Sequence, residues 1–302
     1  MIINKKYKIL NKIGEGSFGY IYKGKHVITN EEVAIKIEPI DTKTPTLCRE
    51  SKILGYLSNI NNVPKLRYYG SQDNKNFMVI DLLGKTLLSE VKNMQIYDKN
   101  MYAYSSDEDN NDNCVIVKDI IINDSTKKII QYTLQMLRLM QDIHKTGFVH
   151  RDIKPDNFLF GLSNPSSMYI IDFGLATTYI NNGVHIENSK NKNMIGTVRY
   201  ASINIHNGDV YSRRDDIISI IYVSIYLLKG RLPWQGLYNT KELKNTYYDL
   251  VGNVKKSTTI TELCLGLPGE YEEICNYIYN LQFEEEPDYN HIKQLLYKII
   301  DR

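Results

Sequence analysis

The first eighty residues place apolar and polar side chains alternately, in short runs separated by turn-forming residues. A period of two over such short runs is typical of β-strands that bury one face. These runs are Tyr7 to Ile13, Tyr20 to His26, Glu32 to Glu38, Leu66 to Gly70 and Phe77 to Ile80. One segment, Thr46 to Leu57, follows Pro45 and has its apolar residues near helical spacing instead. The pattern predicts a small sheet with one helix.

From about Asp124 the apolar residues recur at helical spacing. The first helix of this part is expected to begin after a capping Asp124 or Ser125, to run to Ile143 and to be ended by Gly147. The apolar run from Ile217 to Leu228 is too short to span a bilayer and predicts a helix buried on most sides. The last helix has a clear amphipathic face, formed by Ile292, Leu295, Leu296 and Ile299. The second half is therefore expected to be mainly helical.

Between these parts, residues 93 to 122 are polar, acidic and rich in asparagine, without any period. Such a stretch cannot bury enough apolar surface to order itself. We expect a surface insertion, with a regulatory role as the alternative.

The chain has 302 residues, of which 42% are apolar and 24% charged, which is a globular composition. Lys plus Arg (37) nearly balances Asp plus Glu (35), and the formal charge of +2 predicts no general attraction to nucleic acid or membrane. Any anion binding must be local. The four cysteines, Cys48, Cys114, Cys264 and Cys275, have no spacing typical of zinc sites or disulfide frameworks. A reducing compartment is therefore expected. Neither a signal peptide nor an apolar stretch long enough to span a membrane is present in the sequence.

A glycine-rich motif, Gly14-Glu15-Gly16-Ser17-Phe18-Gly19, lies between two predicted strands. A dinucleotide-binding motif would lead from a strand into a helix, so this context favours a hairpin that covers phosphates. Alone, the motif is a weak signal. Val33-Ala34-Ile35-Lys36 then ends in a lysine that could meet phosphates, and Glu50 in the predicted helix could hold it by a charge-assisted bond. Taken singly, each of these two charges could equally be a solvated surface residue.

The strongest signal is His150-Arg151-Asp152-Ile153-Lys154-Pro155-Asp156-Asn157, followed by Asp172-Phe173-Gly174. Phosphoryl transfer from ATP needs a carboxylate to orient the attacking hydroxyl and receive its proton, which suits Asp152. Lys154 could neutralise charge on the transferred group. Asn157 and Asp172 supply the hard oxygen ligands that Mg²⁺ prefers. The motif therefore predicts phosphoryl transfer with ATP and Mg²⁺ as cofactors.

Together these motifs resemble the signature set of eukaryotic-type protein kinases. Further stretches are similar to the casein kinase one family, over nearly the whole chain from Tyr7 to about Ile300: Gly196 to His206 in place of an Ala-Pro-Glu motif, Ser212 to Asp216, Leu232 to Leu237, and Asp156 to Leu159. The resemblance implies an α+β, bilobal protein kinase fold. Its β-rich N-lobe with one helix would span about 7–80, the hinge 81–84, and the larger, mainly α-helical C-lobe 85–300, including the insert.

The resemblance also implies an ATP site. The adenine would lie between apolar side chains, with Ile80 as the gatekeeper and Asp81 to Leu83 as the hinge. Asp216 would brace the backbone of the catalytic loop. The nucleotide-binding residues implied are Ile13, Gly14, Glu15, Gly16, Ser17, Phe18, Gly19, Tyr20, Ile21, Ala34, Lys36, Glu50, Ile80, Asp81, Leu83, Leu159 and Ile171.

Members of the similar family prefer serine or threonine preceded, three residues earlier, by a phosphorylated or acidic residue. Arg199 matches the family's phosphate-binding arginine, and Lys241 or Lys244 could assist it, with Lys244 preferred here. Thr177 and Thr178 stand where relatives often carry lysines, so a weaker preference for pre-phosphorylated sites is expected. The implied partners are acidic or phosphorylated protein substrates, and we expect a monomer.

The resemblance has two departures. The stretch Thr240 to Asn245 is too acidic for the nuclear-import signal of some relatives, so a cytoplasmic protein is expected, with the nucleus as the alternative. The chain stops at Arg302, which predicts constitutive activity unless acidic residues 107–112 lie against the basic pocket as an internal competitor.

Two other functions compete with a Ser/Thr protein kinase. A catalytically silent pseudokinase or scaffold is disfavoured, because Lys36, Glu50, Asp152, Asn157 and Asp172 are all present. A kinase of small molecules would account for the phosphate-handling residues but not for the stretches at Gly196 to His206 and Arg213 to Asp216.

Overall fold

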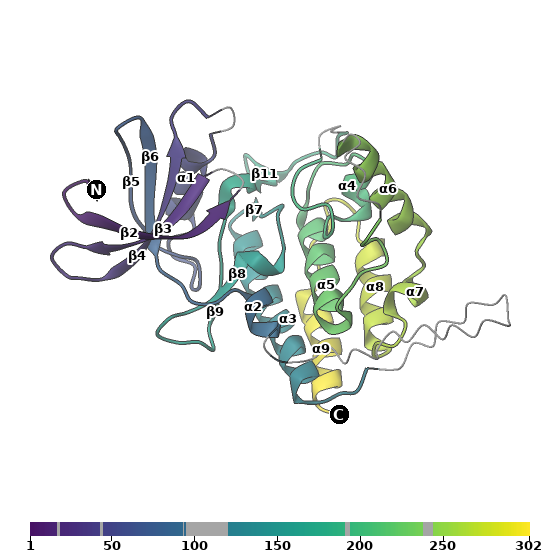
Figure 1. Ribbon diagram of the computed structural model, residues 1–302. Coiled ribbons are helices and arrows are strands. Elements are labelled where there is room, and N and C mark those ends of the chain that lie inside the picture. Colours follow the sequence, from purple (N-terminus) through teal and green to yellow (C-terminus); the bar gives the residue numbers. More distant parts are fainter. Residues whose placement is uncertain (17–18, 43–44, 93, 95–119, 191–193, 238–243) are drawn as a thin grey trace.

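The computed structural model describes residues 1–16, 19–42, 45–92, 94, 120–190, 194–237 and 244–302. Its N-terminal part is a six-stranded antiparallel sheet in the order β1-β2-β3-β4-β6-β5. The strands are β1 (Ile2–Ile3), β2 (Tyr7–Gly16), β3 (Gly19–His26), β4 (Glu32–Pro39), β5 (Leu66–Gln72) and β6 (Lys75–Asp81). Figure 1 shows this sheet beside a larger helical part.

The alternation of side chains along β4 and β6 gives the sheet two apolar faces. Ile35, Phe77 and Val79 join a small outer core, whereas Ala34, Met78 and Ile80 join the main core on the opposite face. Helix α1 (Leu47–Tyr56) covers this second face through Leu47, Ile53 and Leu54. Lys36 is two residues beyond Ala34 and therefore lies on the face that α1 covers.

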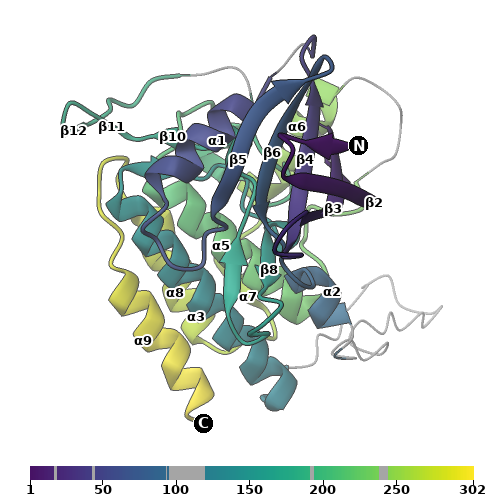
Figure 2. The same cartoon turned by 90° about the vertical axis from the view of Figure 1, so that its left-hand side faces the viewer.

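Helix α5 (Arg213–Lys229) is the centre of the helical part, and most of its residues are buried. At its start the Ser212 amide donates to Oδ2 of Asp215 at 2.9 Å, and the helix ends at Gly230, whose φ of 76° is easily adopted only by glycine. α3 and α9 run side by side (Figure 2), and α3 also packs on α5. The other helices are α2 (Leu87–Lys92), α3 (Asp124–Lys145), α4 (Ile203–His206), α6 (Lys244–Ser257), α7 (Ile260–Cys264), α8 (Glu270–Asn280) and α9 (Tyr289–Ile300).

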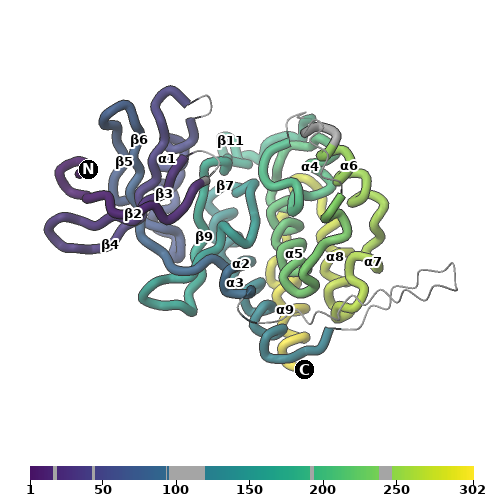
Figure 3. The backbone as a smooth tube through the Cα atoms, viewed as in Figure 1, coloured from purple at the N-terminus to yellow at the C-terminus, as the bar shows by residue number. Residues whose placement is uncertain are grey.

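Short strand pairs lie between the sheet and the helices (Figure 1). β7 (Phe148–Val149) pairs with β10 (Thr177–Thr178), and β8 (Phe158–Phe160) pairs with β9 (Met168–Ile170). The β8–β9 hairpin separates two segments along the chain, the one that follows β7 and the one that follows β9. The two strand pairings bring these segments side by side. A further hairpin, β11 (Ile180–Asn181) with β12 (Val184–His185), follows. The backbone trace in Figure 3 shows the N-terminus at the sheet and the C-terminus at the end of α9.

The predicted α+β composition is confirmed, with a β-rich first part and a helical second part. The predicted helix cap was wrong by one residue: the N-cap of α3 is Asn123, whose side chain accepts a hydrogen bond from the Thr126 amide, and Asp124 and Ser125 lie inside the helix. Strand β1 was not predicted, because two residues carry no periodicity. Most of the 93–122 insert and Cys114 lie outside the described residues.

Two further expectations concern cysteines and membranes. Cys48, Cys264 and Cys275 are free thiols, and the buried Cys264 and Cys275 lie 3.7 Å apart between their sulfur atoms. Across the parts of the chain given above, no helix is both long and apolar enough to cross a membrane.

Candidate active site

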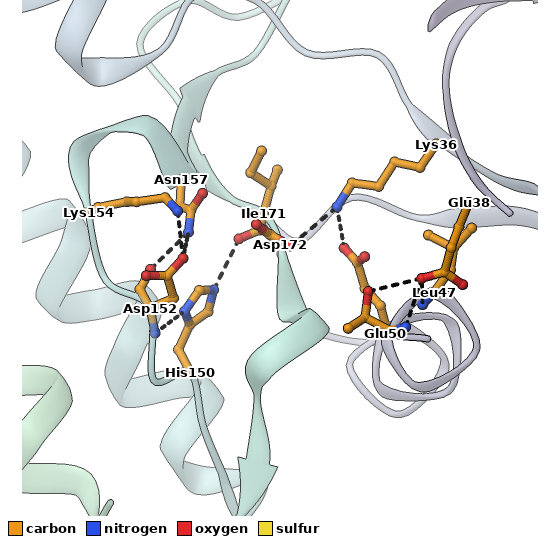
Figure 4. Close-up of polar contacts among 11 residues, drawn as sticks. Lys36, Glu38, Leu47, Glu50, His150, Asp152, Lys154, Asn157, Ile171 and Asp172 are labelled. Atoms are coloured by element: carbon orange, nitrogen blue, oxygen red, sulfur yellow. Dashed lines mark hydrogen bonds and ion pairs between the residues drawn. The ribbon is translucent and has the colours of Figure 1, made fainter. Parts of the chain in front are cut away.

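Three charged side chains meet where the sheet faces the helical part (Figure 4). Lys36 of β4 places Nζ 2.6 Å from Oε1 of Glu50 in α1, and 3.5 Å from Oδ1 of Asp172. Glu50 is 3% exposed. The structure thus brings together residues from a strand, a helix and the loop after β9, all three of which the sequence singled out.

Lys36 attracts both carboxylates of this cluster, but burial together with the charge of Asp172 raises the pKa of Glu50. Burial opposes the positive charge of Lys36, but the attraction of Glu50 and Asp172 outweighs burial and raises the pKa of the ammonium. Burial would likewise raise the pKa of Asp172, but Lys36, His150 and Lys154 together lower it. Lys36 and Asp172 are therefore both charged at neutral pH.

Asp152 is held by three donors. Its Oδ1 accepts from the hydroxyl of Thr197 at 2.6 Å, and its Oδ2 accepts from Lys154 Nζ at 2.6 Å and from Asn157 Nδ2 at 3.3 Å. A carboxylate has about four acceptor positions, so one remains on Oδ1. Asp152 is 6% exposed, and its three donors restrict the orientation of the carboxylate.

Asn157 and Asp172 present oxygens that are suited to a hard cation. Asn157 Nδ2 also donates to the backbone oxygen of Asp152 at 2.8 Å, which leaves its amide oxygen free, and Figure 4 shows that oxygen turned away from Asp152. No group of three or more His, Cys, Asp or Glu in the described parts of the chain could hold a metal by itself. A cation here would need additional oxygens, such as phosphates, which is how Mg²⁺ is commonly bound. The residues fit Mg²⁺ in that sense.

Asp216, near the start of α5, fixes the backbone before Asp152. Its Oδ2 accepts from the His150 amide at 2.7 Å and from His144 Nε2 at 3.1 Å, and its Oδ1 accepts from the Arg151 amide at 3.0 Å. Arg151 has a φ of 69°, a conformation that costs free energy for a residue with a side chain. The two backbone hydrogen bonds offset that cost.

His144 completes this network as a neutral side chain. A carboxylate can only accept, so His144 Nε2 carries the proton, and Nδ1 accepts from the Tyr289 hydroxyl at 2.6 Å. Burial lowers the pKa of His144 below its ordinary 6.5, and the hydrogen bond to Asp216 offsets this only in part. Burial would raise the pKa of Asp216, but its hydrogen bonds with His144 and His150 lower it.

Two of the proposed nucleotide walls lie on the neighbouring strands β4 and β6. Ala34 and Ile80 are cross-strand partners and are 8% and 5% exposed. A cavity of about 50 Å³ lies against Lys36, and its other lining residues include Gly19, Tyr20, Ile21, Glu50 and Asp172. A Cβ on Gly19 would lie 2.1 Å from the Ile37 oxygen, so only glycine allows β3 to lie this close to β4.

The other predicted nucleotide residues vary in exposure. Leu83, Leu159 and Ile171 are half-buried, as is Gly14, whereas Ile13, Glu15 and Tyr20 are exposed. The Asp81 carboxylate accepts from Arg67 at 2.7 Å and from the Lys65 amide at 2.9 Å. Gly16 ends β2, and Ser17 and Phe18 lie outside the described residues.

The predicted anion pocket is described only in part. The exposed guanidinium of Arg199 lies 5.8 Å from the ring centre of Tyr200 and 5.5 Å from that of Tyr226. In the parts of the chain that the structure covers, no carboxylate pairs with it. Lys244 begins α6, but its side chain lies outside the described residues, as does Lys241. Thr177 and Thr178 form the strand β10.

Sequence reasoning missed Glu38, a buried carboxylate on β4. Its Oε1 accepts from the amides of Thr46 and Leu47 at 2.8 and 3.3 Å, and thereby caps α1 from another element. The N-cap residue of α1, Thr46, makes no capping bond of its own. Lys36 and Glu38 stand two apart on one strand, so β4 holds α1 at two points. The Lys-x-Glu spacing is the only trace of this in the sequence.

A family model described as "Protein kinase domain" matches residues 7–294 of the chain. The match includes the sheet, the charged cluster around Lys36, the segment around Asp152 and most of the helical part.

Replacing Glu38 tests its role as the cap of α1. Glu38→Ala leaves the amides of Thr46 and Leu47 without an acceptor and should lower the free energy of unfolding by about 0.5–2 kcal/mol, as loss of an N-cap does. Hydrogen exchange of the first turn of α1 should become faster. Glu38→Gln keeps an acceptor and should change both quantities less. Equal effects of Ala and Gln, or unchanged exchange in α1, would contradict the assignment.

The neutral state of His144 predicts an acid-sensitive stability. The unfolded side chain takes up a proton near pH 6.5, whereas the folded one resists it, so the unfolded state binds more protons below that pH. The contribution of neutral His144 to the free energy of unfolding is complete above about pH 6.5 and is lost as the pH falls. In urea titrations, His144→Gln should be less stable at pH 7.5 but lose less stability between pH 7.5 and 5.5. The exposed His291→Gln serves as control and should follow the wild type; a wild-type slope in His144→Gln would refute the prediction.

Proposed function

The chain belongs to the protein kinase domain family, and we propose that it is a Ser/Thr protein kinase of the casein kinase one type. The match to that family and the arrangement of a β-rich first part and a helical second part confirm the expected bilobal fold. Serine and threonine as the acceptors, ATP with Mg²⁺ as cofactors, and the acidic substrate class are proposals, as are the lobe boundaries given above.

The observation that carries the proposal is the free acceptor position of Asp152. A substrate hydroxyl that donates to Oδ1 would be oriented for in-line attack on the γ-phosphorus of ATP. As the new oxygen–phosphorus bond forms, the bond to ADP breaks, and Asp152 receives the hydroxyl proton. Lys154, in contact with Oδ2, would offset the negative charge that develops.

Lys36 would pair with the phosphates of ATP, held in place by Glu50. Asn157 and Asp172 would hold Mg²⁺, which when bound neutralises phosphate charge. Because Lys36 also contacts Asp172, these residues form one charged surface for the nucleotide.

Arg199 supports the proposed preference for an acidic or phosphorylated residue in the substrate. Its guanidinium is exposed and charged, and two tyrosine rings restrict its position. Thr197, two residues earlier, contacts Asp152, so an anion at Arg199 would bind close to the reacting hydroxyl. We keep a cytoplasmic, monomeric enzyme that binds neither nucleic acid nor membrane as part of the proposal.

Transfer of phosphate to peptides tests the proposed activity. With labelled ATP and Mg²⁺, we expect transfer to a serine peptide with phosphoserine three residues earlier and to an acidic peptide, above a neutral one. Asp152→Asn should lower transfer by ~10²- to 10⁴-fold, because it removes the base, and Asp172→Asn should abolish it. Asp142→Asn, an exposed carboxylate of α3, is the control and should retain activity. If the wild type binds nucleotide but transfers no phosphate, the pseudokinase is favoured instead. If it transfers phosphate to small molecules alone, a kinase of small molecules is favoured.

The anion pocket has its own test. Arg199→Ala should reduce the turnover of the primed and acidic peptides by about tenfold, the effect of losing one charge-assisted hydrogen bond, with little effect on the neutral peptide. Arg199→Lys, which keeps the charge but not the planar fork, should fall between the two. An unchanged ratio of primed to neutral turnover in Arg199→Ala would remove Arg199 from the proposed pocket.

A further inference from the structure

Lys255, on α6, is a buried lysine that contacts no anionic side chain among the described residues. Its side chain is 1% exposed, and Nζ donates to the backbone oxygens of Val198 at 2.7 Å and Ala201 at 2.6 Å. No carboxylate in the described residues lies in contact with it. A lysine is rarely buried so completely unless it is paired, so the position calls for an explanation.

Aromatic rings complete the surroundings of this ammonium. Nζ lies 5.0 Å from the ring centre of Trp234 and 5.4 Å from that of Tyr222. Carbonyl dipoles and aromatic faces attract a cation but compensate lost hydration less fully than a carboxylate does. Burial accordingly lowers the pKa of Lys255 well below its ordinary value. The fold retains a costly group at this point.

The two oxygens that Lys255 binds belong to an irregular segment. Residues 196–201 lie outside the helices and strands. The amides of Tyr200 and Ala201 bond to the Thr197 oxygen within the segment, whereas the oxygens of Val198 and Ala201 find their donor in Lys255. Between the two bound oxygens, the oxygen of Arg199 accepts from Trp234 Nε1 at 2.7 Å. Side chains of α6 and of the loop after α5 therefore hold three carbonyls within four consecutive residues.

The same short segment carries two groups of the candidate site. Thr197 donates to Oδ1 of Asp152, and Arg199 presents its guanidinium to solvent. Gly196 turns with a φ of 89° against the Arg151 oxygen, where a Cβ would lie 2.2 Å away. The segment is thus fixed to the catalytic loop at one end and to Lys255 at the other.

We propose that Lys255 is a positioning residue for the protein substrate, which holds residues 196–201 so that Thr197 and Arg199 face the bound peptide in register with Asp152. This inference rests on the proposed kinase function. α6 lies beside α4 on the side of the helical part away from α9 (Figure 1), whereas Lys36 and Glu50 belong to the sheet and to α1. Lys255 therefore acts on peptide binding and not on nucleotide binding.

The kinetic test compares Lys255→Met with Lys256→Met. Both variants replace a lysine of α6 by methionine, but Lys256 is exposed and makes no hydrogen bond to either carbonyl. Lys255→Met should lower kcat/KM for the peptide by about tenfold or more, as expected when two buried carbonyls lose their donor, and leave KM for ATP within about twofold. Lys256→Met should match the wild type. Equal losses for peptide and ATP, or no loss, would overturn the proposal.

A second measurement does not depend on activity. Hydrogen exchange at the amides of Tyr200 and Ala201, which bond to the Thr197 oxygen, should accelerate in Lys255→Met while α3 and α5 stay protected. Unchanged exchange at these two amides would refute the positioning role of Lys255, whatever the activity of the wild type. Absence of phosphate transfer by the wild type would refute the kinase function but not the positioning role. If Lys255→Met does not fold, Trp234→Phe replaces it. This variant removes the donor to the backbone oxygen of Arg199 and should raise KM for the peptide but not KM for ATP. An unchanged KM for the peptide would count against the proposal.

Discussion

The buried carboxylate of Asp216 is the constraint on which the candidate site depends. It accepts from two consecutive backbone amides, His150 and Arg151, at a point where the chain adopts a left-handed conformation. It lies in the first turn of α5, the most deeply buried helix, where the helix dipole favours a negative charge. A rigid central helix therefore determines the path of the backbone that leads to Asp152. Removing the carboxylate would leave two buried amides unpaired, and the Arg151 conformation would lose its support.

The nucleotide side of the site is fixed from the sheet. β4 contributes Lys36, which pairs with Glu50, and Glu38, which caps α1. Both contacts come from one face of one strand, so the position of α1 follows from the twist and register of the sheet. Glu50 is thereby kept beside Lys36 by two independent interactions. Lys36 and Glu38 together therefore fix both the distance and the orientation of α1 relative to the sheet.

The sequence predicted the elements whose side chains have a regular pattern and the residues that lie in compact motifs. The five principal strands, α1, α3, α5 and α9 all follow from spacing, because one buried face imposes a period. The cluster of Lys36, Glu50 and Asp172 followed from motifs and a resemblance. The cap by Glu38 did not, because its partners are backbone amides eight and nine residues away in the chain. The start of α3 was misplaced because Asn123, Asp124 and Ser125 are all good N-cap residues.

Lysines that donate to backbone oxygens are the contacts that could not be predicted from the sequence. Lys255 holds Val198 and Ala201, and Lys229, also buried, donates to the oxygens of Leu263 and Leu265 at 3.0 Å each. Burial lowers the pKa of both lysines, and no carboxylate of the described residues contacts either of them. An ion pair leaves two charged residues in a sequence, whereas a carbonyl acceptor leaves no sequence signature at all. A near balance of basic and acidic residues therefore does not mean that the charges pair with one another. In this fold part of the basic set orders irregular backbone, and one such segment carries the groups that face the substrate.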